Sequence, residues 1–92
     1  MIPTTERIHQ VLARIETLLV EKNAAYGNSA LDPVRVFSKA SVLDGLFTRT
    51  DDKLARIRHR GLRSSDEDTL LDLIGYLVLI YIALEDARET GR

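Results

Sequence analysis

The feature that most constrains the fold is a segment near the C-terminus, roughly Asp66 to Arg88, whose middle is apolar on nearly every helical face. Its large apolar side chains are Leu70, Leu71, Leu73, Ile74, Leu77, Val78, Leu79, Ile80, Tyr81, Ile82 and Leu84. A helix that is apolar all round must be covered all round. The longest apolar run, Leu73 to Leu84, is about 12 residues, well short of the roughly 20 that span a bilayer. The sequence therefore predicts a long helix buried against protein.

Two arrangements can cover such a helix. The rest of the chain can wrap it completely, or it can cover one side while another subunit covers the remainder. We expect a homo-oligomer, because two or three short helices reach only one side and an uncovered stripe would be a large apolar patch.

The other segments also show helical periodicity. Apolar residues between positions 8 and 19 predict a first helix from about Thr5 to Asn23, with Thr4 or Thr5 as its N-cap. The turn at 26–29 ends this helix, since Gly and Asn tolerate positive φ.

A further helix follows in the middle of the chain. Ser41 with Asp44 resembles a capping box that opens this helix, and Gly61 is its natural end. Ser64 with Glu67, or Ser65 with Asp68, would cap the last helix in the same way.

The stretch from 30 to 40 is ambiguous. Asp32-Pro33 reads as the start of a short helix across Val34, Phe37 and Ala40, while a brief strand over 34–37 would have no partner strand. The predicted fold is an all-α bundle of three to four helices, and residues 1–92 form a single domain.

Charge and composition exclude several classes of protein. The formal net charge is −1, so nucleic acid and membrane surfaces are not expected partners. The sequence has no cysteine, which excludes disulfides and thiolate metal sites. The N-terminus lacks a basic region followed by an apolar one, so we expect no signal peptide and a cytoplasmic protein.

A polar stripe follows the middle helix: Arg49, Asp52, Lys53, Arg56 and Arg60, at helical spacing. One interpretation is an anion site, most simply for phosphate, with Arg as a forked donor and Lys as a point charge. The alternative is a solvated helix face with an Asp52–Arg56 pair.

Two carboxylates of the last helix, Asp68 and Asp72, lie one turn apart. Asp72 falls inside the apolar stretch, so its charge needs a partner. The partner is either a divalent cation such as Mg²⁺, with Asp68 as a second ligand, or a basic residue such as Lys53 or Arg56. Tyr26, at the end of the first helix, either stacks on a base or packs over the helix end.

Three segments together resemble a known family. They are 22–27 (KNAAYG), 49–56 (RTDDKLAR) and 67–76 (EDTLLDLIGY). Their order and spacing resemble the first nucleotide modification associated domain, a small α-helical family common in phage genomes. The resemblance covers roughly residues 20 to 84. It implies a role near phage nucleotide metabolism, in the host cytosol if the chain is encoded by a phage.

The resemblance also implies one combined site that contains Lys22, Tyr26, Arg49, Asp52, Lys53, Arg56, Asp68 and Asp72. A nucleotide would place its base or sugar near Tyr26 and its phosphate near Lys53 with Arg49 or Arg56. Asp68 and Asp72 would orient these cations or hold Mg²⁺.

A more distant resemblance is to MazG-like nucleotide pyrophosphohydrolases, which hold Mg²⁺ between acidic motifs on two helices. Here Glu16 and Glu21 of the first helix do not share a face.

Three functions follow from the sequence. The first is a nucleotide-binding protein without strong catalysis, which sequesters an immune signal in a pocket near a subunit boundary. The second is a MazG-like Mg²⁺-dependent hydrolase of nucleoside triphosphates. The third is a helical interaction module without a small-molecule ligand.

Overall fold

The computed structural model describes residues 1–33 and 40–89, and these ranges hold three helices joined by turns. The helices are α1 (Thr4–Ala25), α2 (Val42–Arg60) and α3 (Glu67–Glu89). The all-α prediction is confirmed, and the helix bounds lie within one or two residues of those expected from periodicity and capping. The short helix or strand expected across 34–40 falls almost entirely outside the described residues.

The starts and ends of the helices follow local chemistry. Ser41 caps α2, its hydroxyl accepting from the amide of Asp44 at 3.0 Å, as predicted. Gly61 ends α2 at φ 77°, and its amide donates to the carbonyl of Ile57. Beyond α1, Gly27 and Asn28 take φ values of 60° and 62°, which turns the chain as expected.

Two capping predictions were wrong. At α1 the N-cap is Pro3, without a side-chain hydrogen bond, and Thr4 is already helical. At α3 the helix begins at Glu67, so Ser64 and Ser65 lie too early to cap it. Asp66 takes the position before the first helical residue, and its carboxylate accepts from the amide of Arg63 at 3.0 Å.

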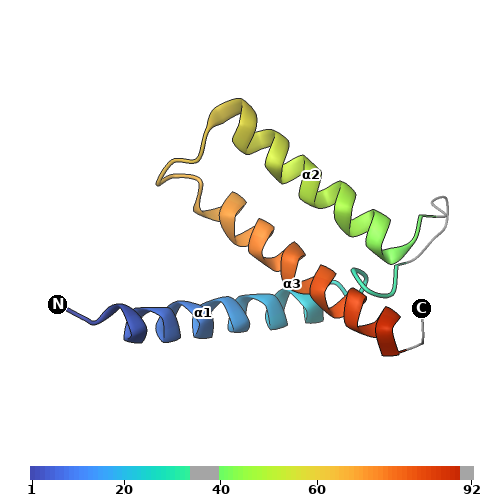
Figure 1. Ribbon diagram of the computed structural model, residues 1–92, viewed down its shortest axis with the longest axis horizontal. Coiled ribbons are helices and arrows are strands. Elements are labelled where there is room, and N and C mark those ends of the chain that lie inside the picture. The colour runs from blue at the N-terminus through green and yellow to red at the C-terminus, as the bar shows by residue number, and fades with distance from the viewer. Residues whose placement is uncertain (34–39, 90–92) are drawn as a thin grey trace.

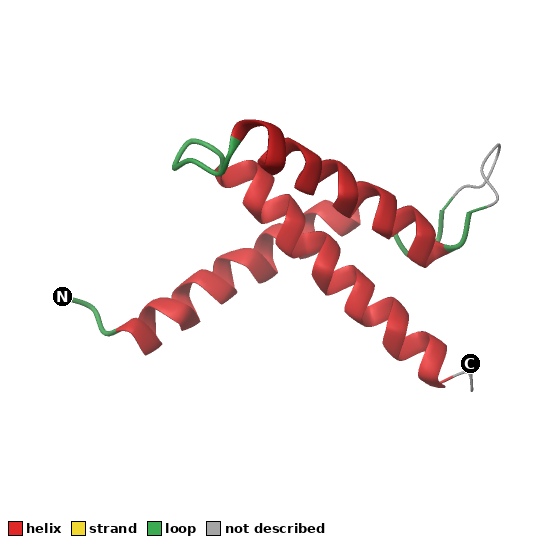
Figure 2. Ribbon diagram, turned by 45° about the horizontal axis from the view of Figure 1, so that its top comes forward, coloured by secondary structure: helices red, strands yellow, loops and turns green. Residues whose placement is uncertain are grey.

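The helices α2 and α3 form an antiparallel hairpin, and α1 crosses α3 near the middle of α3 (Figures 1 and 2). The crossing is close at Gly75, where an added Cβ would lie 2.8 Å from Cδ2 of Leu19. A side chain at this position would therefore force the Leu19 side chain to shift. The N-terminal half of α1 continues beyond the hairpin (Figure 1).

The arrangement is open for a chain of this size. The radius of gyration is 15.3 Å, whereas a compact domain of this length has about 12 Å. Among the described residues, the buried apolar side chains are Ile15, Leu46 and Ala83, one from each helix, and Leu46 is the most completely buried of them. The helices therefore bury few apolar side chains and leave much apolar surface exposed.

No helix among the described residues has the length and apolar character needed to cross a membrane.

Candidate functional site

A groove of about 880 Å³ runs along the crossing of α1 and α3, and we call it the α1–α3 groove. Its walls are mainly apolar, with Leu12 and Ile15 from α1 and Leu79 and Ile82 from α3. The polar residues in its lining include Lys22, Tyr26, Arg49, Asp72 and Tyr76. The groove thus combines an apolar floor with cationic and aromatic side chains, as small-molecule sites commonly do.

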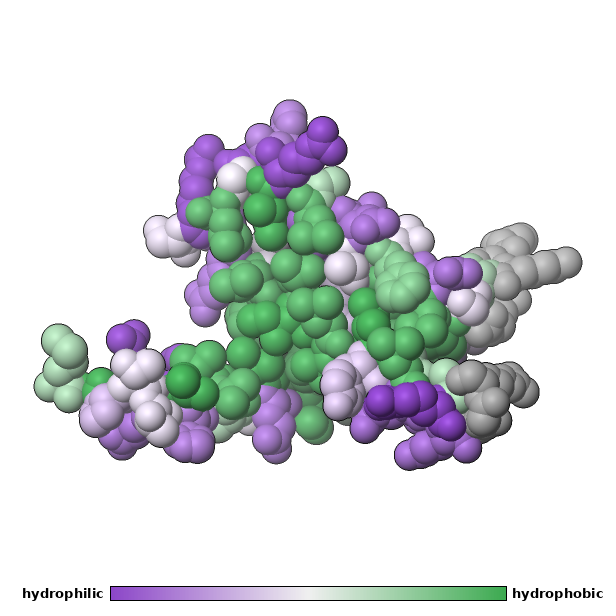
Figure 3. Space-filling model, viewed as in Figure 1, coloured by the Kyte–Doolittle hydropathy of each residue, from purple (hydrophilic) through white to green (hydrophobic). Residues whose placement is uncertain are grey.

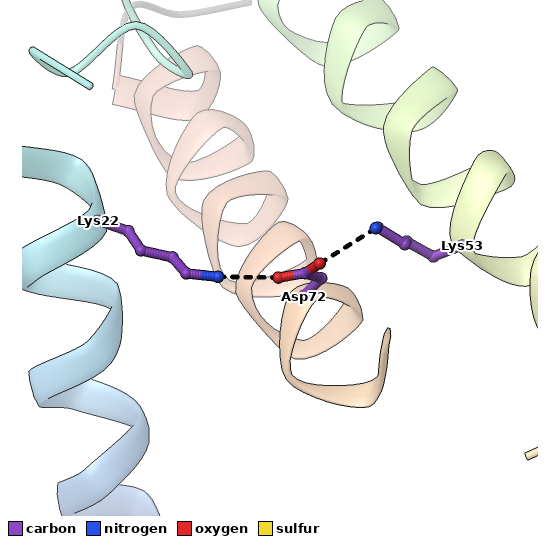
Figure 4. A network of polar contacts seen from close by, with 3 residues as sticks. All are labelled: Lys22, Lys53 and Asp72. Carbon is purple, nitrogen blue, oxygen red and sulfur yellow. Dashed lines mark hydrogen bonds and ion pairs between the residues drawn. The ribbon is translucent and has the colours of Figure 1, made fainter. Parts of the chain in front are cut away.

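Asp72 is the centre of the charged cluster. Its Oδ1 accepts from Nζ of Lys22 at 2.9 Å, and its Oδ2 lies 3.1 Å from Nζ of Lys53. Figure 4 shows the carboxylate between the two ammonium groups, one reaching it from α1 and the other from α2. A single carboxylate of α3 therefore ties all three helices together.

The environment shifts the pKa values of this cluster. Partial burial raises the pKa of the Asp72 carboxyl, but the hydrogen bonds and charges of Lys22 and Lys53 outweigh it, and the net pKa is lowered. The hydrogen bond to Asp72 raises the pKa of Lys22, against a smaller opposing effect of desolvation. Both groups are therefore charged at neutral pH.

The cluster keeps a positive balance. Lys22 and Lys53 share one carboxylate, and Arg49 adds a third cation at the same groove without an ion pair to any described residue. Glu16 also lines the groove, but it lies six residues before Lys22, about 9 Å further along α1. The end of the groove near Lys22 therefore carries more positive than negative charge.

The expected site residues separate into two groups. Lys22, Tyr26, Arg49 and Asp72 line the groove, and Lys53 joins them through Asp72. The second group, Asp52, Arg56 and Asp68, is exposed and does not line the groove. Within the described chain no Asp52–Arg56 ion pair forms.

The last member of the polar stripe has a different role. Arg60 lies 3.7 Å from the carboxylate of Asp66, at the turn between α2 and α3. This ion pair belongs to the closed end of the hairpin, away from the groove.

The donor set does not favour Mg²⁺. Both oxygens of Asp72 face ammonium groups, so of the two partners that the sequence allowed, the basic residue is present. Across residues 1–33 and 40–89, no group of three or more His, Cys, Asp or Glu side chains is placed to hold a metal ion. The described residues therefore support the two ion pairs of Asp72 and not a metal site.

Two features of the groove were not predicted. Tyr76 was part of the motif at 67–76 but was not assigned to the site, and Gly75 was not recognised as the contact point of α1. An isolated glycine within an otherwise apolar helix is a signal for close packing, and it could have located the crossing.

Comparison with known protein families, with curated proteins and with solved structures finds no match. The family resemblance therefore rests on the motif residues alone and stays a hypothesis.

Proposed function

We propose that this chain binds a nucleotide, or a related small molecule that carries phosphate, in the α1–α3 groove. The observation that supports this most is the pairing of Lys22 and Lys53 with one carboxylate, Asp72, in an apolar groove that Arg49 also lines. Phosphate is the anion that such a mixed Arg and Lys cluster recognises well.

The ion pairs leave donors for a ligand. An ammonium group has three N–H donors, and Asp72 accepts one from each lysine. Arg49 has a guanidinium with five donors and no ion pair to a described residue. A phosphate at this part of the groove would therefore find the donors of Arg49 and those of the two lysines that Asp72 positions.

The aromatic residues suit a base. Tyr26 is exposed beside the groove, and Tyr76 lines it from α3. Stacking of a base on an aromatic ring contributes about 1–3 kcal/mol and tolerates any base. The groove volume of about 880 Å³ lies in the range of small-molecule sites, roughly 300–1,000 Å³.

The role that fits this chemistry is binding without turnover. In a phage setting, such binding would remove a nucleotide signal, including one used in host immunity. The proposal does not require a metal ion, in keeping with the arrangement of Asp72 between two lysines.

Isothermal titration with linear and cyclic nucleotides tests the proposal, with inorganic phosphate as a competitor. Arg49→Gln should weaken binding by about tenfold or more, because a hydrogen bond to a charged group contributes about 1.5–3 kcal/mol. Arg56→Gln is the matched control, since Arg56 lies two turns along the same helix and outside the groove. Chromatography of the incubated nucleotides, with Mg²⁺ present, detects any hydrolysis.

Each result has a defined meaning. The proposal is supported if Arg49→Gln weakens nucleotide binding, Arg56→Gln does not, and the nucleotide is recovered without hydrolysis. Absence of binding to every nucleotide at millimolar concentration refutes it, and release of pyrophosphate would replace it with the hydrolase function.

A further inference from the structure

The outer face of α3 carries an exposed apolar seam. It consists of Leu70, Ile74, Leu77, Tyr81 and Leu84, which we call the α3 seam. Four of its members expose between 40% and 63% of their surface, and Ile74 is half-buried. The spacing alternates between four and three residues, which is the pattern of a helix that packs along another helix.

The chain's own helices do not cover this seam. The hairpin partner α2 and the crossing helix α1 both already contact α3, yet these side chains stay exposed. Figure 3 shows apolar surface spread over the middle of the molecule and continuing along α1. Ile8 and Leu12, in the first half of α1, are exposed as well.

The exposed area is too large for a chain that stays alone. A folded monomer of 10.4 kDa has an accessible surface of about 5,400 Å². This chain has 7492 Å², about 2,100 Å² more. An obligate dimer buries about 1,000–2,500 Å² on each partner, so the excess is what one such interface would remove.

We infer that a second copy of this chain covers the α3 seam, through its own α3 seam, in a two-fold symmetric pair. A two-fold axis brings the same patch of both copies together, and a heptad-spaced apolar stripe is complementary to itself. The net charge of −1 adds little repulsion between copies. The inference does not depend on the proposed ligand.

The position of Leu77 provides a sharp test. Leu77 is the middle residue of the α3 seam, so it faces its own counterpart whether the paired helices run parallel or antiparallel. The chain has no cysteine, and a single introduced cysteine therefore reports only its own position. Leu77→Cys should form a cross-linked pair under mild oxidation.

The matched control is Leu62→Cys, in the turn between α2 and α3. Leu62 exposes 51% of its surface and Leu77 exposes 52%, but Leu62 lies outside the seam. It should cross-link at least tenfold more slowly. The end position distinguishes the two orientations, because Leu70→Cys pairs with itself only in a parallel arrangement.

The mass of the unmodified chain is measured by light scattering, without ligand. Twice 10.4 kDa, or a higher even multiple, together with rapid cross-linking of Leu77→Cys, is the expected result. A monomer at high micromolar concentration would overturn the inference and point to another protein as the occupant. An oligomer in which Leu77→Cys fails to cross-link would also overturn it. All these measurements are made without nucleotide. A negative result therefore refutes the inferred pair of chains and leaves the proposed nucleotide binding to its own test.

Discussion

Replacement of Asp72 by Asn removes the charge that joins α1 and α2 to α3 while keeping the size of the side chain. The pair with Lys22 is largely exposed and contributes about 0.2–1 kcal/mol. The pair with Lys53 is more protected, since Lys53 has only 18% of its side chain exposed, and a hydrogen bond to a charged group contributes about 1.5–3 kcal/mol. Asn retains one acceptor, so the expected loss is about 2 kcal/mol.

This loss is measurable by urea denaturation followed by circular dichroism. It corresponds to a decrease in the melting temperature of about 8–16 °C for a chain of this length. The protein concentration must be fixed, because association changes the apparent stability. Asp52→Asn is the control, since Asp52 is exposed on α2 and forms no ion pair with a described residue, and it should change stability by less than about 0.5 kcal/mol.

A double-mutant cycle separates the contribution of Lys53. The double variant with Lys53→Met and Asp72→Asn should lose less free energy of unfolding than the sum of the losses in the two single variants. The difference, which is the coupling energy, should be about 1 kcal/mol. If Asp72→Asn is as stable as the unmodified chain, or if the two changes are additive, the three-helix ion-pair arrangement does not hold the fold together.

Three further perturbations test the packing and the electrostatics. Stability should be constant between about pH 5 and pH 9 and fall on both sides. The pKa of Asp72 is lowered in the folded state, so stability is lost as falling pH protonates this carboxylate. The pKa of Lys22 is raised in the folded state, so stability is lost as rising pH deprotonates this ammonium group. The midpoint of urea denaturation, measured across pH, reports both effects. Asp72→Asn should reduce the dependence of stability on pH on both the acidic and the basic side. Gly75→Val should lower the free energy of unfolding by about 1–3 kcal/mol, because the new side chain overpacks against Leu19. In a Leu19→Ala background the same change should destabilise the protein less. If the effects of the two changes simply add, the close crossing at Gly75 is contradicted. Leu46→Ala should cost about 2–5 kcal/mol in the same assay, because Leu46 is the most completely buried side chain described, and a loss below 1 kcal/mol would contradict its place in the core.

The helices were predictable because their signals are local. The α2 cap at Ser41 and its end at Gly61 depend on side chains and dihedral angles within one turn of the chain. The N-cap of α1 was missed because Pro3 takes that position, its carbonyl accepting from the amide of Arg7 at 3.1 Å. Thr4 and Pro3 are both acceptable at a helix start, so composition alone did not separate them.

The site was predictable only in part, because its geometry depends on how α1 crosses α3. Lys53 was an expected partner of Asp72, since both lie on helices that are neighbours in the sequence. Lys22 lies 50 residues from Asp72, and no local pattern states that the two meet. For the same reason, the sequence did not distinguish Arg49 from Arg56 as a phosphate ligand. In the structure, Arg49 lines the groove and Arg56 does not.

The way α1 is attached has a consequence for the order in which the chain folds. The α2–α3 hairpin closes a short turn, so its contacts form at small entropic cost. The contact of Lys22 with Asp72 closes a loop of 50 residues, and such long-range contacts form later. We therefore expect α1 to dock after the α2–α3 hairpin has formed. Since α1 supplies one wall of the groove, we expect the groove to be complete only once α1 has docked.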